Sequence, residues 1–103
     1  MMLETRKANG EVITGSVKLI HAAGMHARPA VKLTKLAKKF QAQISVRASA
    51  TAQWINAKSV SKIMTLRAAR DSIMEFKASG EDAEAAVAAL VDLIAADFPD
   101  TDP

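Results

Sequence analysis

The chain has 103 residues, half of them apolar, with 14 basic and 11 acidic residues and a formal net charge of +3. This length supports one hydrophobic core without disulfides or metals, and the lack of cysteine excludes a disulfide framework, a thiol nucleophile and a thiolate zinc site. The small positive excess does not indicate nucleic-acid binding, and no stretch approaches the roughly 20 apolar residues that span a bilayer.

The chain divides into an arm, a domain and a tail. Residues 1–15 have mixed polarity without a period and lack the apolar run of a secretory signal, so we expect a loose arm on a cytoplasmic protein without membrane insertion. The regular apolar patterns lie in residues 16–98, which form the expected domain, and residues 99–103 form a frayed tail.

A strand is predicted over residues 16–20, where Val17 and Leu19 alternate with polar side chains. His21 ends this strand, five residues before His26. No carboxylate or cysteine stands near these histidines in the sequence, so we interpret His21 as a surface or edge residue and predict no metal site.

The main candidate site is the segment Ala-Gly-Met-His-Ala-Arg-Pro-Ala, residues 23–30. Gly24 permits a turn and Pro29 suits a first helical turn, so a helix is expected to begin close to His26. The positive end of the helix dipole favours a bound anion and a neutral imidazole, which is a nucleophile. Arg28 adds donors that fit phosphate oxygens. The segment therefore predicts a histidine that accepts a phosphoryl group beside N–H donors and a guanidinium.

An amphipathic helix is predicted over residues 27–40. The lysines between residues 32 and 39 lie mostly on its other face, and they indicate either a solvated surface or a basic patch that attracts an acidic partner. The apolar residues recur at helical spacing and are Leu33, Leu36, Ala37 and Phe40.

Two strands are expected next, over residues 41–48 and 51–55, paired as a hairpin. The turn residues 50–52 include no glycine, so a longer or less regular connection is predicted. We expect Trp54 to pack against the edge of the sheet.

A second helix is predicted within residues 56–66, with Ser59 near its start as an N-cap. Val60 and Met64 lie at helical spacing and form a candidate apolar strip for docking, because methionine adapts to varied surfaces.

The last third of the chain predicts a turn, a strand and a helix. Residues 67–71 include no glycine, so we expect either a longer second helix or a turn that Asp71 carries through side-chain hydrogen bonds. A strand is predicted over residues 72–79, and Asp82 is expected to cap a final helix that ends near Phe98. The resulting order, βαββαβα, indicates an α+β open-faced β-sandwich with three helices covering one face of a four-stranded sheet.

Three segments, in matching order and spacing, resemble the HPr family of phosphocarrier proteins of the bacterial phosphoenolpyruvate-dependent sugar phosphotransferase system. Residues 23–30 resemble its active-site motif, residues 56–60 (Asn-Ala-Lys-Ser-Val) its regulatory-serine segment, and residues 78–82 the turn into its last helix. The resemblance covers about residues 16–98 and implies an antiparallel, HPr-like sheet.

This resemblance implies a phosphohistidine carrier rather than a stand-alone enzyme, with no cofactor or metal of its own. His26 would accept phosphate on Nδ1 from phosphorylated enzyme I and pass it to an enzyme IIA domain, while Arg28 and the backbone N–H groups of Ala27 and Arg28 hold the charge. The serine that matches Ser59 is phosphorylated in many relatives, which makes it a candidate regulatory site that needs a dedicated serine kinase. A monomer is expected. The candidate partner contacts are Met25, Lys35, Lys38, Val60, Lys62 and Met64.

Two other interpretations stay open. The chain could be a regulatory binding module that uses Ser59 and the apolar strip, with His26 secondary. It could also be an HPr-like component of a nitrogen-type or dihydroxyacetone-kinase branch, which would keep the phosphoryl relay but serve a different acceptor.

Overall fold

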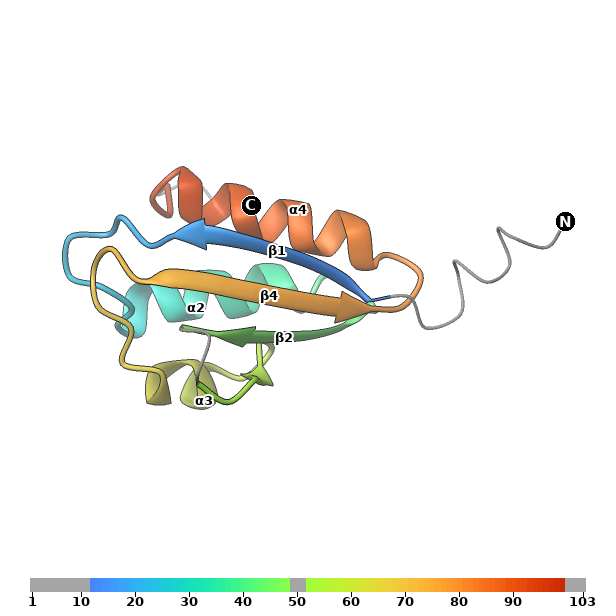
Figure 1. Cartoon of the computed structure of the whole chain (residues 1–103), viewed down its shortest axis with the longest axis horizontal. Helices are drawn as coiled ribbons and strands as arrows, with labels where there is room; N and C mark the ends of the chain where they lie inside the picture. The colour runs from blue at the N-terminus through green and yellow to red at the C-terminus, as the bar shows by residue number, and fades with distance from the viewer. Residues whose placement is uncertain (1–11, 49–51, 100–103) are drawn as a thin grey trace, which may run out of the picture.

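The computed structural model describes residues 12–48 and 52–99, which form four strands and three helices in the predicted order (Figure 1). The strands pair as one antiparallel sheet in the order β1-β4-β2-β3. The predicted open-faced α+β fold is therefore confirmed. The elements are β1 (Ile13–Lys18), α2 (Ala27–Ala37), β2 (Gln43–Arg47), β3 (Ile55–Asn56), α3 (Val60–Thr65), β4 (Ile73–Ser79) and α4 (Ala83–Ala95).

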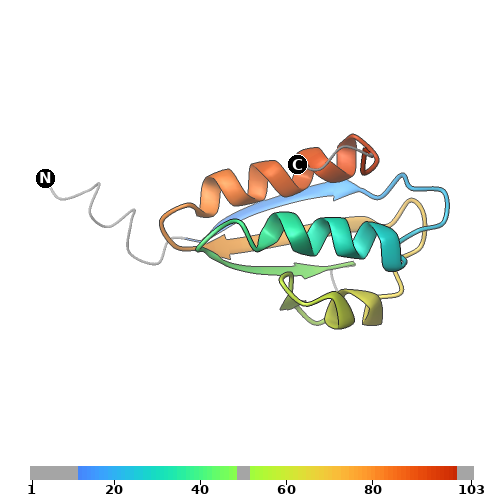
Figure 2. The ribbon, with the colours of Figure 1, turned by 180° about the vertical axis from the view of Figure 1, so that it is seen from behind.

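The helices cover one face of the sheet, and the core lies between the two layers. Figure 2 shows α2 and α4 side by side across the sheet, with α3 next to α2. Alternate residues of β2 and β4 point toward the helices and are buried, so the period of two in these strands sets the core face. The largest fully buried side chains include Phe76, Leu19, Leu33, Ile63, Met74, Leu90 and Ile94. Within the described residues, no helix is both long and apolar enough to cross a membrane.

The first strand begins earlier than the sequence predicted. Residues 13–15, which we expected in the arm, already pair with β4, and Ile13 lies opposite Ala78. Gly15 obscured this strand in the sequence because glycine is a poor strand residue. In the fold, a Cβ at Gly15 would lie 2.7 Å from Cγ1 of Val87, so the glycine permits close packing of β1 on α4. The rest of the expected arm, residues 1–11, and residues 100–103 of the tail lie outside the described residues.

The connection from α3 to β4 decides between the two predicted alternatives. The helix ends at Thr65, so the longer helix is wrong. Arg67 and Asp71 take the left-handed conformation, with φ of 49° and 76°, at a turn where glycine would be the ordinary choice. The Asp71 N–H donates to the Leu19 carbonyl at 2.6 Å. The position of the turn at Asp71 is thus confirmed, but the hydrogen bond that holds it comes from the backbone and not from the side chain as we expected.

Other boundaries differ by a few residues. The first helix ends at Ala37 and is followed by a turn through residue 40, whereas the sequence predicted a helix through residue 40. The hairpin strand β3 has only two residues. Residues 49–51, on which most of the predicted irregular turn falls, lie outside the described residues.

Trp54 lies over the face of the sheet that the helices leave uncovered. The Arg47 guanidinium and the Lys77 Nζ lie 4.3 and 4.6 Å from its ring centroid. These cations belong to β2 and β4, which are the central strands, so the indole covers the middle of the sheet and not its edge as we expected. Arg47 also donates to Glu75 at 2.6 Å, which ties the two central strands together on this face.

The two predicted caps behave differently. Ser59 is the N-cap of α3, and its hydroxyl accepts a hydrogen bond from the Lys62 N–H at 3.2 Å, as predicted. Asp82 occupies the N-cap position of α4 but makes no side-chain capping bond. Its carboxylate instead accepts the N–H groups of Gln41 and Ala42, each at 2.8 Å. The hydrogen bond from Gln41, followed by that from Ala42, lowers the pKa of Asp82 below its ordinary value of 3.8 despite partial desolvation.

An Asp82→Asn substitution is expected to remove a pH-dependent part of the stability. Because folding lowers the pKa of Asp82, the ionised carboxylate stabilises the protein above pH 3.8, and this contribution is lost as the pH falls through the lowered value. The variant should therefore be less stable than the wild type at neutral pH, and the difference in unfolding free energy should shrink on acidification. Urea unfolding at neutral and several acidic pH values measures this difference. A difference of constant size would contradict the assigned role.

Candidate functional site

His26 lies at the start of α2, as the sequence predicted. It is the N-cap residue with an extended backbone, φ −126° and ψ −166°, and its carbonyl accepts the first helical hydrogen bond from Ala30 at 3.0 Å. The preceding turn is made by Gly24, whose φ is +74°, and the Gly24 N–H donates to the His21 carbonyl at 2.9 Å. The His26 side chain is exposed, so its ring is accessible to a partner protein.

The loop before His26 is fastened to the α3–β4 connection, a contact that we call the loop brace. Its three backbone hydrogen bonds run from Met25 N–H to the Ala68 carbonyl, from Leu19 N–H to the Ser72 carbonyl, and from Asp71 N–H to the Leu19 carbonyl. The approach is close, because a Cβ on Gly24 would lie 2.6 Å from the Ala68 oxygen. The brace fixes the position of His26 from outside its own helix.

The first turn of α2 suits an anion. It contains no acidic residue, and the N–H groups of Ala27 and Arg28 lie at the positive end of the helix dipole. Pro29 occupies the third helical position and has no N–H to satisfy, which is consistent with the prediction that it belongs to the first turn. The exposed Arg28 side chain adds a fixed charge on the same turn. A phosphoryl group on His26 would therefore meet positive potential from the backbone and from a side chain.

Charge is segregated along the chain, and the site lies in the positive part. Eleven of the fourteen basic residues and none of the eleven acidic residues fall within residues 12–70. This range includes α2 and α3, whereas the acidic residues beyond position 70 lie in the segment that contains β4, α4 and the tail. The basic residues of α2 and α3 favour encounter with an acidic partner surface, although Asp97 brings one carboxylate to this corner.

A shallow hollow lies on α2 beside His26 and combines apolar with basic side chains. Val31 is 49% exposed at its centre, and Lys32 donates to the Pro99 carbonyl at 2.9 Å. The hollow is lined by Ala27, Arg28, Val31, Lys32 and Lys35. An exposed valine among basic side chains offers apolar contact within a positively charged region.

The residues predicted to contact partners are placed unequally. Lys35, Lys38, Lys62 and Met64 are exposed, and Val60 is half-buried. Met25 is only 5% exposed and belongs to the hydrophobic core, so the structure does not place it on a contact surface. Val31 could not be singled out from the sequence, because its position in an amphipathic helix does not distinguish an exposed valine from a core residue.

His21 has the least expected surroundings. Its Nε2 lies 3.2 Å from Nε2 of His26, and its Nδ1 lies 3.0 Å from Oδ1 of Asp97. The two imidazole rings are stacked with centroids 5.2 Å apart, and Phe98 packs its ring against His21 at 5.8 Å. Asp97 is 76 positions from His21, so no local pattern could have indicated this contact. Across the described ranges, no group of three or more side chains is arranged to hold a metal ion.

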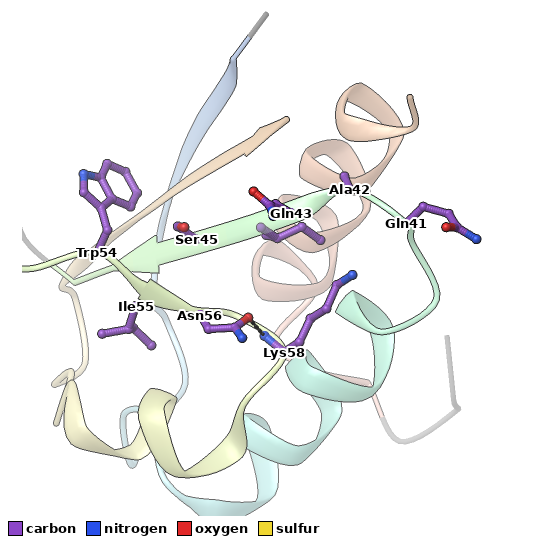
Figure 3. A pocket seen from close by; sticks show the side chains of 9 residues that line it. Gln41, Ala42, Gln43, Ser45, Trp54, Ile55, Asn56 and Lys58 are labelled. Atoms are coloured by element: carbon purple, nitrogen blue, oxygen red, sulfur yellow. Dashed lines mark hydrogen bonds between the residues drawn. The ribbon is translucent and has the colours of Figure 1, made fainter. Parts of the chain in front are cut away.

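A pocket at the other end of α2 offers no comparable chemistry (Figure 3). It is lined by residues of β2 and β3 and of the segments next to them, and Lys58 is the one ionisable residue in its lining. The Lys58 ammonium donates to the Phe40 carbonyl at 2.7 Å, and the Lys58 N–H donates to the Asn56 side chain at 2.9 Å. These groups support the turn, and the pocket has no acid–base pair. The His26 corner therefore stays the candidate site.

Most of the chain matches a known protein family. A family model described as "PTS HPr component phosphorylation site" matches residues 13–96, which cover most of the chain and include the His26 corner and all four strands. The chain belongs to the HPr family.

Curated HPr relatives span nearly the same length. The phosphocarrier protein HPr of Haemophilus influenzae is 38% identical over 78 residues, which are 76% of this chain and 89% of the relative. That of Neisseria meningitidis serogroup A is 34% identical over 79 residues, covering 77% of this chain and 86% of the relative. The HPr family also includes parts of longer proteins. A multiphosphoryl transfer protein of Vibrio cholerae is 38% identical over 78 residues, but the match covers only 20% of its length.

Solved HPr structures share the fold. The crystal structure of HPr-C-His from Thermoanaerobacter tengcongensis has a TM-score of 0.77 and 36% identity and covers 84% of this chain and 94% of that one. HPr from Bacillus anthracis has a TM-score of 0.74 and 30% identity, with 81% and 96% covered. The fold and the family identified from the sequence are thus both confirmed.

Proposed function

We propose that this HPr-family chain is a cytoplasmic phosphoryl carrier that accepts phosphate on His26 from phosphorylated enzyme I and passes it to an enzyme IIA domain. The observation that supports this most directly is an exposed histidine at the N-cap of α2, with Arg28 in the same first turn and no acid there. The alternative in which His26 is secondary leaves this arrangement without a use.

In the proposed reaction, the lone pair on His26 Nδ1 attacks phosphorus, and a P–N bond forms as the bond to the donor breaks. Arg28 and the N–H groups of Ala27 and Arg28 stabilise the charge on the equatorial oxygens during transfer. The same P–N bond then breaks when the acceptor attacks, and its electron pair returns to Nδ1. The chain needs no cofactor or metal of its own for these steps.

The partner surface is proposed to combine the hollow on α2 with the exposed part of α3. Val31 and Met64, 49% and 37% exposed, would supply apolar contact, and Lys35, Lys38 and Lys62 would supply charge toward acidic partners. We expect a monomer. The acceptor defines whether this carrier serves a sugar, a nitrogen-type or a dihydroxyacetone-kinase branch. Genome neighbours would distinguish the three branches.

The proposal is tested by incubating the chain with enzyme I and phosphoenolpyruvate and measuring intact mass. We expect a gain of one phosphoryl group that is lost in acid, is stable in base and maps to His26 on fragmentation. No gain, or a phosphoryl group on another residue, would contradict the proposal.

Replacing Arg28 by alanine should slow phosphoryl transfer about ten- to a hundredfold, because a charged donor near the phosphoryl oxygens is lost. The unfolding free energy should change by less than about 0.5 kcal/mol, since the side chain is exposed. An Arg28→Lys variant keeps the charge without the planar guanidinium, so its transfer rate should lie between those of the wild type and Arg28→Ala. Quenched-flow transfer assays measure the rates, and an unchanged rate in Arg28→Ala would remove the proposed role.

Phosphorylation of Ser59 stays a prediction. Its hydroxyl accepts a hydrogen bond from the Lys62 N–H and lies 3.3 Å from the Ser61 hydroxyl, and the residue is half-buried. A phosphate there would exchange one capping interaction for a stronger one, so the cap and the regulatory role are compatible. A serine kinase of the host would have to carry out the reaction.

A further inference from the structure

His21 and Asp97 form a hydrogen-bonded chain that ends on His26. Nε2 of His26 lies 3.2 Å from Nε2 of His21, whose Nδ1 lies 3.0 Å from Oδ1 of Asp97. The Nδ1 atom of His26 makes no hydrogen bond within the described part of the chain. The hydrogen bonds from Asp97 through His21 therefore reach the His26 ring at Nε2, on the side opposite to Nδ1, its proposed reacting atom.

The direction of these hydrogen bonds follows from proton counting. An ionised carboxylate only accepts, so the Nδ1 of His21 must carry a hydrogen and donate it to Asp97. A neutral His21 then has no hydrogen on Nε2, and this atom accepts. His26 must donate from its own Nε2, and a neutral imidazole with its hydrogen on Nε2 has a bare lone pair on Nδ1.

We propose that His21 and Asp97 are positioning residues that hold His26 in the tautomer whose Nδ1 lone pair is free to attack phosphorus. This inference rests on the proposed function, because it concerns the reactivity of the same histidine. His21 touches no reacting atom and acts only through the His26 ring, by hydrogen bonding and by stacking at 5.2 Å.

The end of α4 is built to deliver this carboxylate. The helix ends at Ala95, and Asp97 and Phe98 then take left-handed conformations with φ of 61° and 51°. The Phe98 N–H donates back to the Leu93 carbonyl at 3.0 Å, and the Phe98 side chain is buried and packs against the His21 ring. Left-handed backbone is uncommon in residues other than glycine and is most acceptable for Asp and Asn, so this reversal fixes Asp97 in a specific place.

The same arrangement suits both directions of transfer. When Nδ1 attacks, the P–N bond forms and the hydrogen on Nε2 stays in place, so the phosphorylated ring gains positive charge. His21 then accepts a stronger hydrogen bond from that ring, supported by Asp97. When an acceptor takes the phosphoryl group, the electron pair of the P–N bond returns to Nδ1 and the neutral tautomer is restored. Neither step needs a proton to leave or enter the ring.

The side chains of His21 and Asp97 are 26% and 49% exposed, so water competes for these hydrogen bonds and the effect should be moderate. We expect substitution of either residue to slow phosphoryl acceptance about three- to tenfold, without abolishing it. A larger loss would point to a direct role in the reaction.

The test uses two variants of the full chain and one control. His21→Phe keeps an aromatic ring between His26 and Phe98 but removes both hydrogen bonds. Asp97→Asn keeps a residue type that accepts left-handed backbone, but its amide can either accept or donate. The matched control is Asp92→Asn, which removes one exposed carboxylate from α4, five residues before Asp97, and therefore the same unit of charge.

Imidazole ¹⁵N chemical shifts of the unphosphorylated protein give the tautomer directly and need no partner protein. In the wild type and in Asp92→Asn we expect His26 to carry its hydrogen on Nε2, and in the two test variants we expect a mixture of tautomers with slower phosphoryl acceptance. A wild-type His26 with its hydrogen on Nδ1, or test variants with unchanged tautomer and rate, would overturn the inference. A wild type that shows the expected tautomer but is never phosphorylated would instead contradict the proposed function alone.

Discussion

A His26→Ala variant is expected to lose phosphoryl acceptance by about 10³-fold or more, to the background of the assay, because the attacking atom itself is removed. Its fold should be unchanged, since the His26 ring is exposed and the loop brace uses backbone groups of its neighbours. The measurement is transfer from phosphorylated enzyme I, followed by intact mass. Circular dichroism and thermal unfolding of the same sample establish that the variant is folded.

The matched control for this variant is Gln53→Ala, an exposed polar residue that lies before β3, outside the His26 corner. It should accept phosphate at the wild-type rate. A His26→Ala protein that still gains an acid-labile phosphoryl group would show that another residue is the acceptor, and the proposed carrier function of His26 would be wrong.

A Phe76→Ala variant is expected to lose about 3–5 kcal/mol of unfolding free energy, because the transferred apolar surface and the remaining cavity both act against the native state. Phe76 is fully buried in β4, a central strand, where it faces the helices. The total free energy of unfolding of a domain of this size is about 5–15 kcal/mol, so such a loss removes a large fraction of the stability. Urea unfolding monitored by circular dichroism measures it.

Ile73→Ala in the same strand provides the comparison. Ile73 is 45% exposed and faces away from the core, so its truncation should cost less than about 1 kcal/mol. Equal losses at the two positions would mean that the uncovered face contributes to stability as much as the core does, which would contradict the assigned layering.

The parts of the fold that depend on local chemistry could be predicted from the sequence. Gly24 and Pro29 placed the start of α2, and the hydroxyl of Ser59 placed the start of α3. The start of β1 was missed because Gly15 interrupts the alternation of apolar and polar residues. The reason for a glycine at this position, close packing against α4, is visible only in the folded structure. The left-handed backbone of Arg67 was missed because arginine carries no signal for that conformation.

The candidate site was predictable only in part. His26 and Arg28 follow from a single contiguous segment, so the sequence contains the whole pattern. The pairing of His21 with Asp97 joins opposite ends of the domain and depends on the chain reversal after α4. Met25 was misplaced because an apolar residue next to a functional one fits a docking surface and a core equally well, and only its 5% exposure decides between them.

The loop brace has a consequence for how such a carrier is used. Because backbone contacts hold the loop before His26 in place, the domain offers every partner the same rigid template, and the adjustment falls on the partners. Donor and acceptor must then bind overlapping surfaces around His26, so the two cannot be bound at once. Each complex must dissociate before the next can form, which favours short-lived complexes over tight association.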